Sequence, residues 1–153
     1  MRRANLLLEH AFFNRIRLDA VVAKHPEQKP GMSSINVTCD VKKHNEDPTR
    51  FLIQMAVTIS PKDEKSPGLY EGELVAVGGF RVTENVQEND RADLVVVNGK
   101  AIMYGVIREM VANLSARGSH GVYFLPTVTF CDEAAKVPAV APKKSKKVVK
   151  PSP

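Results

Sequence analysis

The sequence predicts an α+β fold: a four-stranded antiparallel meander sheet, then one long helix, then an extended apolar strip. Three observations support this fold class. Apolar and polar residues alternate through the first half of the chain, a spacing of three and four residues recurs over about 102–117, and an almost unbroken apolar segment follows in "RGSHGVYFLPTVTF", residues 117–130. With 153 residues and 43% hydrophobic content, the chain has the length and composition of a single globular domain.

Four stretches are predicted to be strands because their apolar residues occupy every second position. The alternating residues are Ile16, Leu18, Ala20 and Val22 in the first stretch, Ile35, Val37, Cys39 and Val41 in the second, and Phe51, Ile53, Met55, Val57 and Ile59 in the third. The fourth stretch covers about 69–82, where Gly78 and Gly79 indicate a bulge or a close approach of another backbone. Polar turns such as "KHNEDP" separate the stretches, so we expect consecutive strands to pair and to bury one face of the sheet.

A loop over about 83–93 and a short apolar run, 94–97, precede the predicted helix. Its apolar stripe consists of Met103, Ile107, Met110 and Leu114, widened by Ile102, Val106 and Val111. The polar face carries Arg108, Glu109 and Asn113. Gly105 places the start of the regular helix near itself, because glycine costs about 1 kcal/mol relative to alanine in a helix interior. Gly118 is suited to the left-handed conformation that ends a helix.

The chain divides into an N-terminal arm, 1–11, a main domain, 12–131, and a tail, 132–153. The tail is rich in lysine and proline and has no aromatic residue, so we expect it to be disordered. Its six lysines against Asp132 and Glu133 give it a charge of +4, which leaves +1 for the body out of the total of +5. The apolar run at the N-terminus, Leu6 to Leu8, is too short for a signal sequence or a membrane span. We therefore expect a cytoplasmic protein without membrane insertion, in which Cys39 and Cys131 are reduced thiols.

Catalysis and cofactor binding are not expected. The four histidines, His10, His25, His44 and His120, lack ligand-like spacing, so no metal site is predicted. No Ser, Cys or carboxylate stands in a recognisable nucleophile or acid/base motif, and no phosphate-binding loop occurs. The expectation is a protein that is not an enzyme and needs no cofactor.

Residues 102–130, "IMYGVIREMVANLSARGSHGVYFLPTVTF", resemble the signature region of the SecB protein-export chaperones. The positions that match the family pattern without a gap are Ile102, Arg108, Glu109, Arg117, Gly118, Leu125, Val128 and Phe130. Upstream, "ELVAVGGF" resembles a second family pattern, carried here by Glu73, Gly78 and Phe80. The resemblance covers about residues 12–131 and is strongest in the last third.

The resemblance implies an ATP-independent holdase chaperone, a homotetramer built as a dimer of dimers, whose long apolar groove holds unfolded preproteins. The client-binding residues it implies are Phe130, Val128, Leu125, Tyr123, Tyr104 and Met103. The oligomer contacts it implies are Glu73, Gly78, Phe80, Arg108 and Glu109. The face that would dock the export motor SecA carries Asp19, Glu73, Arg15 and Arg17. Because Arg15 and Arg17 add positive charge where the family is acidic, we expect weak or no binding of the basic SecA tail.

Three alternatives stay open on the sequence. The apolar strip, including Val122 and Phe124, which are more apolar than is usual in the family, is interpretable as a segment packed wholly in its own core. The chaperone is interpretable as one dedicated to a toxin–antitoxin pair, with the antitoxin as its client, because the family's second helix is truncated here to "DEAAKV". As a third alternative, the tail lysines bind nucleic acid in a nonspecific and salt-sensitive way.

Overall fold

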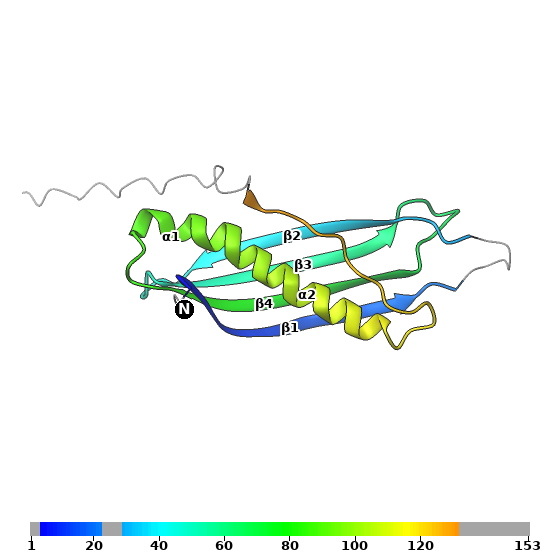
Figure 1. The fold of residues 1–153 in the computed structure, drawn as a ribbon, viewed down its shortest axis with the longest axis horizontal. Helices are drawn as coiled ribbons and strands as arrows, with labels where there is room; N and C mark the ends of the chain where they lie inside the picture. Colours follow the sequence, from blue (N-terminus) through cyan, green and yellow to red (C-terminus); the bar gives the residue numbers. More distant parts are fainter. Residues whose placement is uncertain (1–3, 23–28, 132–153) are drawn as a thin grey trace, which may run out of the picture.

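A four-stranded sheet carries one long helix diagonally across one of its faces (Figure 1). This arrangement is seen in a computed structural model of the chain, which describes residues 4–22 and 29–131. The predictions of disorder and of nucleic-acid binding for the tail therefore lie outside the described residues. The elements are β1 (Leu6–Ala20), β2 (Ser33–Lys43), β3 (Arg50–Pro61), β4 (Tyr70–Val82), α1 (Glu88–Leu94), η1 (Val95–Gly99) and α2 (Lys100–Ser115).

All strand pairs are antiparallel, which confirms the predicted class, but the strand order is β1-β4-β3-β2. The sequential meander is therefore correct only for β2, β3 and β4, and β1 pairs with β4 at the far edge of the sheet. The reason lies in the connections. Residues 44–49 and 62–69 join strands that are neighbours in the sheet, whereas the longer connection 21–32 joins strands at opposite edges.

Helix α2 packs on one face of the sheet, which we call the covered face. We call the opposite face the open face. On β3 every second residue of the covered face, from Phe51 to Ile59, is buried, as the alternation predicts. The corresponding row of the edge strand β2 is only half-buried, because the helix does not extend over it. Ile16 on the other edge, β1, is 48% exposed although its partner across the ladder, Leu74, is fully buried.

The first strand is longer than the sequence indicates. Residues 6–11, predicted to be an arm, lie in β1 and pair with the end of β4. Their alternation is interrupted by two register shifts, between Leu8 and His10 and between Phe13 and Arg15. A bulge moves later side chains to the opposite face, so a search for strict period-two alternation misses this part of the strand.

The helix begins earlier than predicted. It runs without interruption from Glu88 to Ser115, and residues 95–97 of the apolar run lie in a π-helical segment, Val95–Gly99, inside it (Figure 1). Val95 and Val96 are buried, and a Cβ on Gly99 would lie 2.6 Å from Ile53 Cδ1. Packing of this segment on the sheet thus overrides the low helix propensity of consecutive valines.

The buried face of α2 is also rotated from the predicted stripe. Met103, Ile107 and Val111 are fully buried as expected, but Leu114, near the end of the helix, and Ile102 are 38% and 37% exposed. Gly118 does not adopt a positive φ, so its predicted left-handed role is wrong. Its lack of a side chain serves packing instead, since a Cβ would lie 2.5 Å from the hydroxyl of Tyr70.

Gly78 allows the helix to approach β4 closely, and it provides a stability test. A Cβ at Gly78 would lie 2.3 Å from the sulfur of Met103, which is fully buried, whereas a Cβ at Gly105 would meet nothing within 4 Å. We expect Gly78→Ala to lower the free energy of unfolding by about 1 to 3 kcal/mol through overpacking. Gly105→Ala, the matched control, should raise it by about 0.5 to 1 kcal/mol. Urea unfolding of both variants measures this, and equal effects would contradict the close approach at Gly78.

Candidate functional site

The strip, residues 121–131, leaves the end of the helix and crosses the covered face beside α2 towards β2 (Figure 1). It has no regular secondary structure up to Phe130. Its inward side chains include Leu125 and Phe130, which are 1% and 8% exposed and belong to the hydrophobic core. Its outer row consists of Val122, Phe124 and Val128, which are 51%, 66% and 36% exposed. The strip is thus both a cover for the core and an apolar surface.

The start of the strip is fixed by two buried polar side chains. Tyr70 donates its hydroxyl to the carbonyl of Gly121 at 2.8 Å. Ser115 donates to the carbonyl of Val111 at 2.7 Å and accepts from the backbone N–H of Tyr123 at 2.8 Å. Gly121 has a φ of 75°, which favours glycine and turns the chain onto the sheet.

The middle of the strip is fixed by Tyr104 of α2. Its hydroxyl donates to the carbonyl of Pro126 at 2.7 Å, and its ring lies edge-on to Phe130 with the centroids 6.2 Å apart. Burial raises the pKa of the Tyr104 phenol above its usual value, so the group is a proton donor across the physiological range.

Four of the six predicted client-binding residues are therefore core residues in this protomer. Leu125, Phe130, Met103 and Tyr104 are each at most 8% exposed, and Tyr123 is half-buried against the core. Val128 alone lies in the outer row. For Leu125 and Phe130 the core interpretation of the strip describes this protomer better. Alternation within the strip was the signal that separates Val122 and Phe124 from Tyr123 and Leu125, and it was visible in the sequence.

A second partly open apolar row lies on β2. Its covered-face residues, Ile35, Val37, Cys39 and Val41, are half-buried and pack against the core. No strand pairs with the outer edge of β2 among the described residues. The outer row of the strip and this row of β2 are thus partly exposed hydrophobic surfaces without a specific polar pattern.

The open face carries the residues predicted to dock SecA, and their charges are mutually compensated. Arg15 forms an ion pair with Glu73, and Arg17 Nε lies 2.7 Å from Asp19 Oδ2. The hydrogen bond to Asp19 raises the pKa of Arg17 above its ordinary value. Each of these carboxylates therefore faces a cation of its own subunit, so this part of the face is not a free acidic surface.

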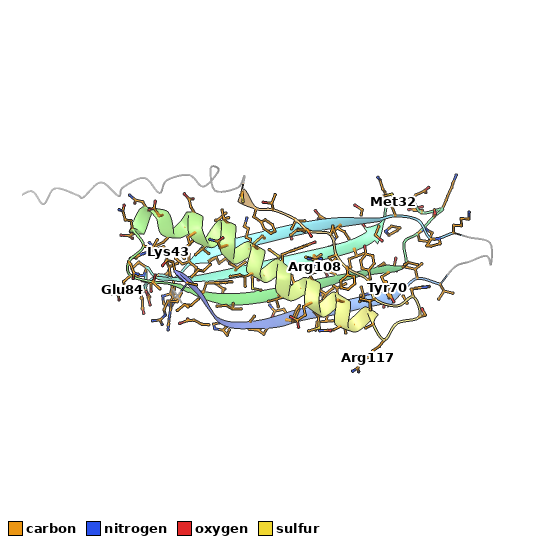
Figure 2. The ribbon with its side chains drawn as sticks, viewed as in Figure 1. Met32, Lys43, Tyr70, Glu84, Arg108 and Arg117 are labelled. Atoms are coloured by element: carbon orange, nitrogen blue, oxygen red, sulfur yellow. The ribbon has the colours of Figure 1, made fainter. Side chains whose placement is uncertain are left out.

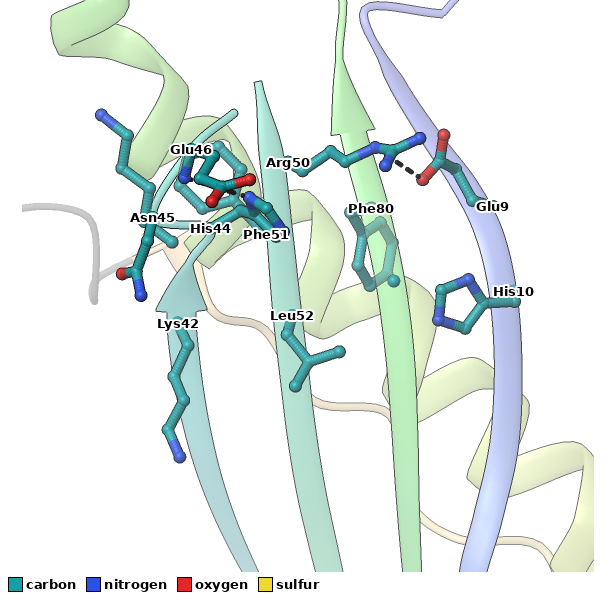
Figure 3. A pocket seen from close by; sticks show the side chains of 12 residues that line it. Glu9, His10, Lys42, His44, Asn45, Glu46, Arg50, Phe51, Leu52 and Phe80 are labelled. Carbon is teal, nitrogen blue, oxygen red and sulfur yellow. Dashed lines mark hydrogen bonds and ion pairs between the residues drawn. The ribbon is translucent and has the colours of Figure 1, made fainter. Parts of the chain in front are cut away.

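A cavity of about 630 Å³ lies at the other end of the open face (Figure 3). Leu52 and Gly79 form part of its lining, and the ring of His10 occupies the space beside Gly79 where a side chain would stand. Glu9, in the first bulge of β1, lies 2.7 Å from Arg81 and 3.5 Å from Arg50, which are direct partners across the ladder. The bulge thus directs a carboxylate onto two like charges that would otherwise repel.

The predicted oligomer contacts fall into two groups. Gly78 and Phe80 are buried within the protomer, and Gly78 lies against Met103; their role as subunit contacts stays a prediction. On α2, Glu109 is exposed and its neighbour Arg108, labelled in Figure 2, is half-buried. Glu73 is engaged with Arg15 on the open face.

Over residues 4–22 and 29–131, no helix is long and apolar enough to cross a membrane. Within the same ranges no group of three or more His, Cys, Asp or Glu residues is arranged to hold a metal ion.

The model of the family described as preprotein translocase subunit SecB matches residues 4–132, most of the chain. The protein belongs to the SecB family. The resemblance noted in the helix and the strip is therefore confirmed, and it extends upstream through β1. No curated protein matches this SecB-family chain.

Among solved structures, this SecB-family protein is similar to the Mycobacterium tuberculosis Rv1957 SecB-like chaperone in complex with a ChAD peptide from the Rv1956 HigA1 antitoxin. The identity is 16% and the TM-score 0.56, over 82% of this chain and 91% of that chain. This likeness shows that the two proteins share the SecB-like fold. A protein of unknown function from Streptococcus agalactiae matches at 13% identity and a TM-score of 0.44, over 80% of this chain and 97% of that chain.

Proposed function

We propose that this SecB-family chaperone is an ATP-independent holdase that works in the cytoplasm and keeps unfolded client polypeptides from aggregating. Its clients are extended, unfolded segments, either preproteins bound for export or an antitoxin. The chain acts on them by binding and not by chemistry.

One observation carries the proposal: the exposed outer row of the strip, Val122, Phe124 and Val128, lies on a segment whose inward side chains pack in the core and whose course is set by side-chain hydrogen bonds. An apolar surface of this kind binds any unfolded segment, at about 25 cal/mol per Å² of apolar area removed from water. Repetition of the row in several subunits raises the effective concentration of binding sites and makes holding tight but reversible.

The assembly is proposed to be a homotetramer, a dimer of dimers. The outward surface of α2 supports contact between copies, because the apolar Ile102 is exposed there beside the charged Glu109. An exposed apolar side chain on an outer helix face permits packing against a second helix. Light scattering tests this directly. A monomer at micromolar concentration that is well folded by circular dichroism would contradict both the tetramer and the repeated-site mechanism.

The holding activity is tested with a slowly folding protein diluted from denaturant, whose aggregation is followed by turbidity. We expect a stoichiometric amount of the chaperone to suppress aggregation equally with and without ATP. Aggregation at the rate of the client alone would contradict the proposed function.

A dedicated antitoxin chaperone is the second candidate, and the open face favours it. Export through SecA requires a partner for the basic SecA tail, whereas Asp19 and Glu73 are already paired with Arg17 and Arg15. The Rv1957 SecB-like chaperone is described in complex with an antitoxin peptide, which gives a precedent in a protein of the same fold. Capture of an antitoxin from the same host, with no effect on export of preproteins, would distinguish the two roles.

The charge pairs on the open face lead to a prediction about SecA. The unaltered protein should bind the isolated zinc-binding tail of SecA weakly or not at all. Arg15→Asp combined with Arg17→Ser frees Glu73 and Asp19, so affinity for the basic tail should rise about tenfold or more at low salt and decline as salt is added. Titration calorimetry measures this. Tight binding by the parent, unaffected by the double change, would contradict the assignment of the docking face.

A further inference from the structure

The strip is attached to the fold in an unusual way for a segment that covers a core. Among the described residues, no backbone–backbone hydrogen bond involves residues 122–130. Two side chains bind the strip backbone in place of a neighbouring strand. Ser115 accepts from the N–H of Tyr123, and Tyr104 donates to the carbonyl of Pro126. A strand inside a sheet shares many cooperative bonds, whereas this strip depends on a few local ones. Segments of that kind open locally at low free energy.

The remaining attachment comes from two apolar anchors five positions apart. Leu125 and Phe130 belong to one buried cluster with Met103, Ile107 and Val111 of α2, and Phe130 also meets the ring of Tyr104. The backbone between them is irregular and contains Pro126, which has no N–H to contribute to a ladder. The strip is thus an extended peptide whose inward side chains fill apolar sites in the core. Its backbone makes few hydrogen bonds. This is how an unfolded client segment would bind.

We propose that the strip occupies a client-binding site of its own subunit, and that an extended client segment displaces it. We call this the tethered-occupant model, because the strip stays covalently attached to the chain. The segment would carry a large aliphatic side chain and, about five residues later, an aromatic one, which take the places of Leu125 and Phe130. This inference rests on the proposed holdase function and identifies the preferred client chemistry. The client first contacts the outer row of the strip. After the strip has moved away, the client binds the buried apolar sites that Leu125 and Phe130 had filled.

This exchange couples client affinity to strip opening. When a client binds only the open form, its apparent dissociation constant is the intrinsic one divided by the fraction of open molecules. Weakening the attachment of the strip should therefore strengthen client binding, whereas a purely structural strip would give the opposite result.

The test uses the full-length protein and the variant Tyr104→Phe. This change removes the hydroxyl that binds the Pro126 carbonyl and keeps the ring that meets Phe130. We expect hydrogen exchange at the Tyr123 amide, which is hydrogen-bonded to Ser115, to accelerate about fivefold, and affinity to rise by about the same factor, for the loss of one typical hydrogen bond. The probe is a labelled synthetic peptide with the sequence of residues 119–130, compared with the same peptide carrying serine in place of Leu125 and Phe130.

The matched control is Thr49→Val, which removes a hydroxyl hydrogen bond to Asp47 in the β2–β3 turn and does not touch the strip. It should change neither exchange over the strip nor peptide affinity. If Tyr104→Phe does not fold, Ser115→Ala serves the same purpose, because it removes the acceptor for the Tyr123 N–H.

Faster exchange with unchanged or weaker peptide binding would overturn the proposal, and so would unchanged exchange. Equal binding of the two peptides would overturn the claim that the aliphatic and the aromatic side chain are recognised. The aggregation assay separates these failures from a failure of the proposed function. If the parent protein holds clients but Tyr104→Phe does not bind the peptide more tightly, only the tethered-occupant model is contradicted.

Discussion

Replacing Phe130 with aspartate is expected to unfold or severely destabilise the protein. Phe130 is 8% exposed and packs on Tyr104, so the change removes a buried aromatic ring and places a carboxylate in an apolar site. Removing a buried phenylalanine side chain costs about 3 to 5 kcal/mol, and burying an unpaired charge adds to that cost. Domains are stable by about 5 to 15 kcal/mol, so most of the stability would be lost.

Phe124→Asp is the matched control for this prediction. The substitution is chemically identical and lies six residues away on the same strip, but Phe124 is 66% exposed. Its free energy of unfolding should stay within about 0.5 kcal/mol of the parent, as is usual at exposed sites. Urea or thermal unfolding of both variants decides the matter. Equal stability of the two variants would show that the inward and outward rows of the strip are wrongly assigned.

Changing Val122, Phe124 and Val128 together to serine is expected to remove most of the client holding while the fold stays intact. Each apolar side chain contributes up to about 1.5 to 3 kcal/mol when a client fully desolvates it. Because about 1.4 kcal/mol corresponds to a factor of ten in affinity, the triple variant should bind unfolded clients at least about tenfold more weakly. Aggregation suppression and client titration give the measurement, with circular dichroism as the check on the fold.

The open face offers a control of equal size. Leu7, Phe12 and Leu52 are 44%, 49% and 40% exposed there, which is close to the exposure of the outer row. Changing these three to serine removes a similar amount of exposed apolar surface from the opposite side of the sheet and should leave holding unaffected. If both triple variants lose holding equally, binding depends on general surface hydrophobicity and the strip has no special role.

The α+β class, three of the four strands and the core row of β3 could be predicted from the sequence. The row from Phe51 to Ile59 is buried as the alternation predicts, because a central strand has one face entirely under the helix. The prediction weakened at the edges. In β1 two bulges break the alternation, and Ile16 on this edge strand is half-exposed.

The sequence pointed to the strip as the candidate site, but most of the strip residues it named face the core and not the outside. The family resemblance correctly drew attention to residues 121–131, and Val128 lies in the outer row. Phe130 and Leu125, however, face inward. A run of apolar residues without a regular partner has no fixed orientation until the surfaces beside it are known, so alternation alone does not say which row is outside.

The sequence by itself determined that this chain belongs to a family with a sheet, a long helix and an apolar strip, since those properties depend on local periodicity and on matched motifs. Only the tertiary structure decided that β1 lies beside β4, that the helix starts at Glu88, and which strip residues are accessible. These features depend on contacts between residues far apart in the chain, such as Tyr104 with Pro126 and Glu9 with Arg50. Local propensities do not encode such contacts, because the free energy of burying one surface against another exists only once both are in place.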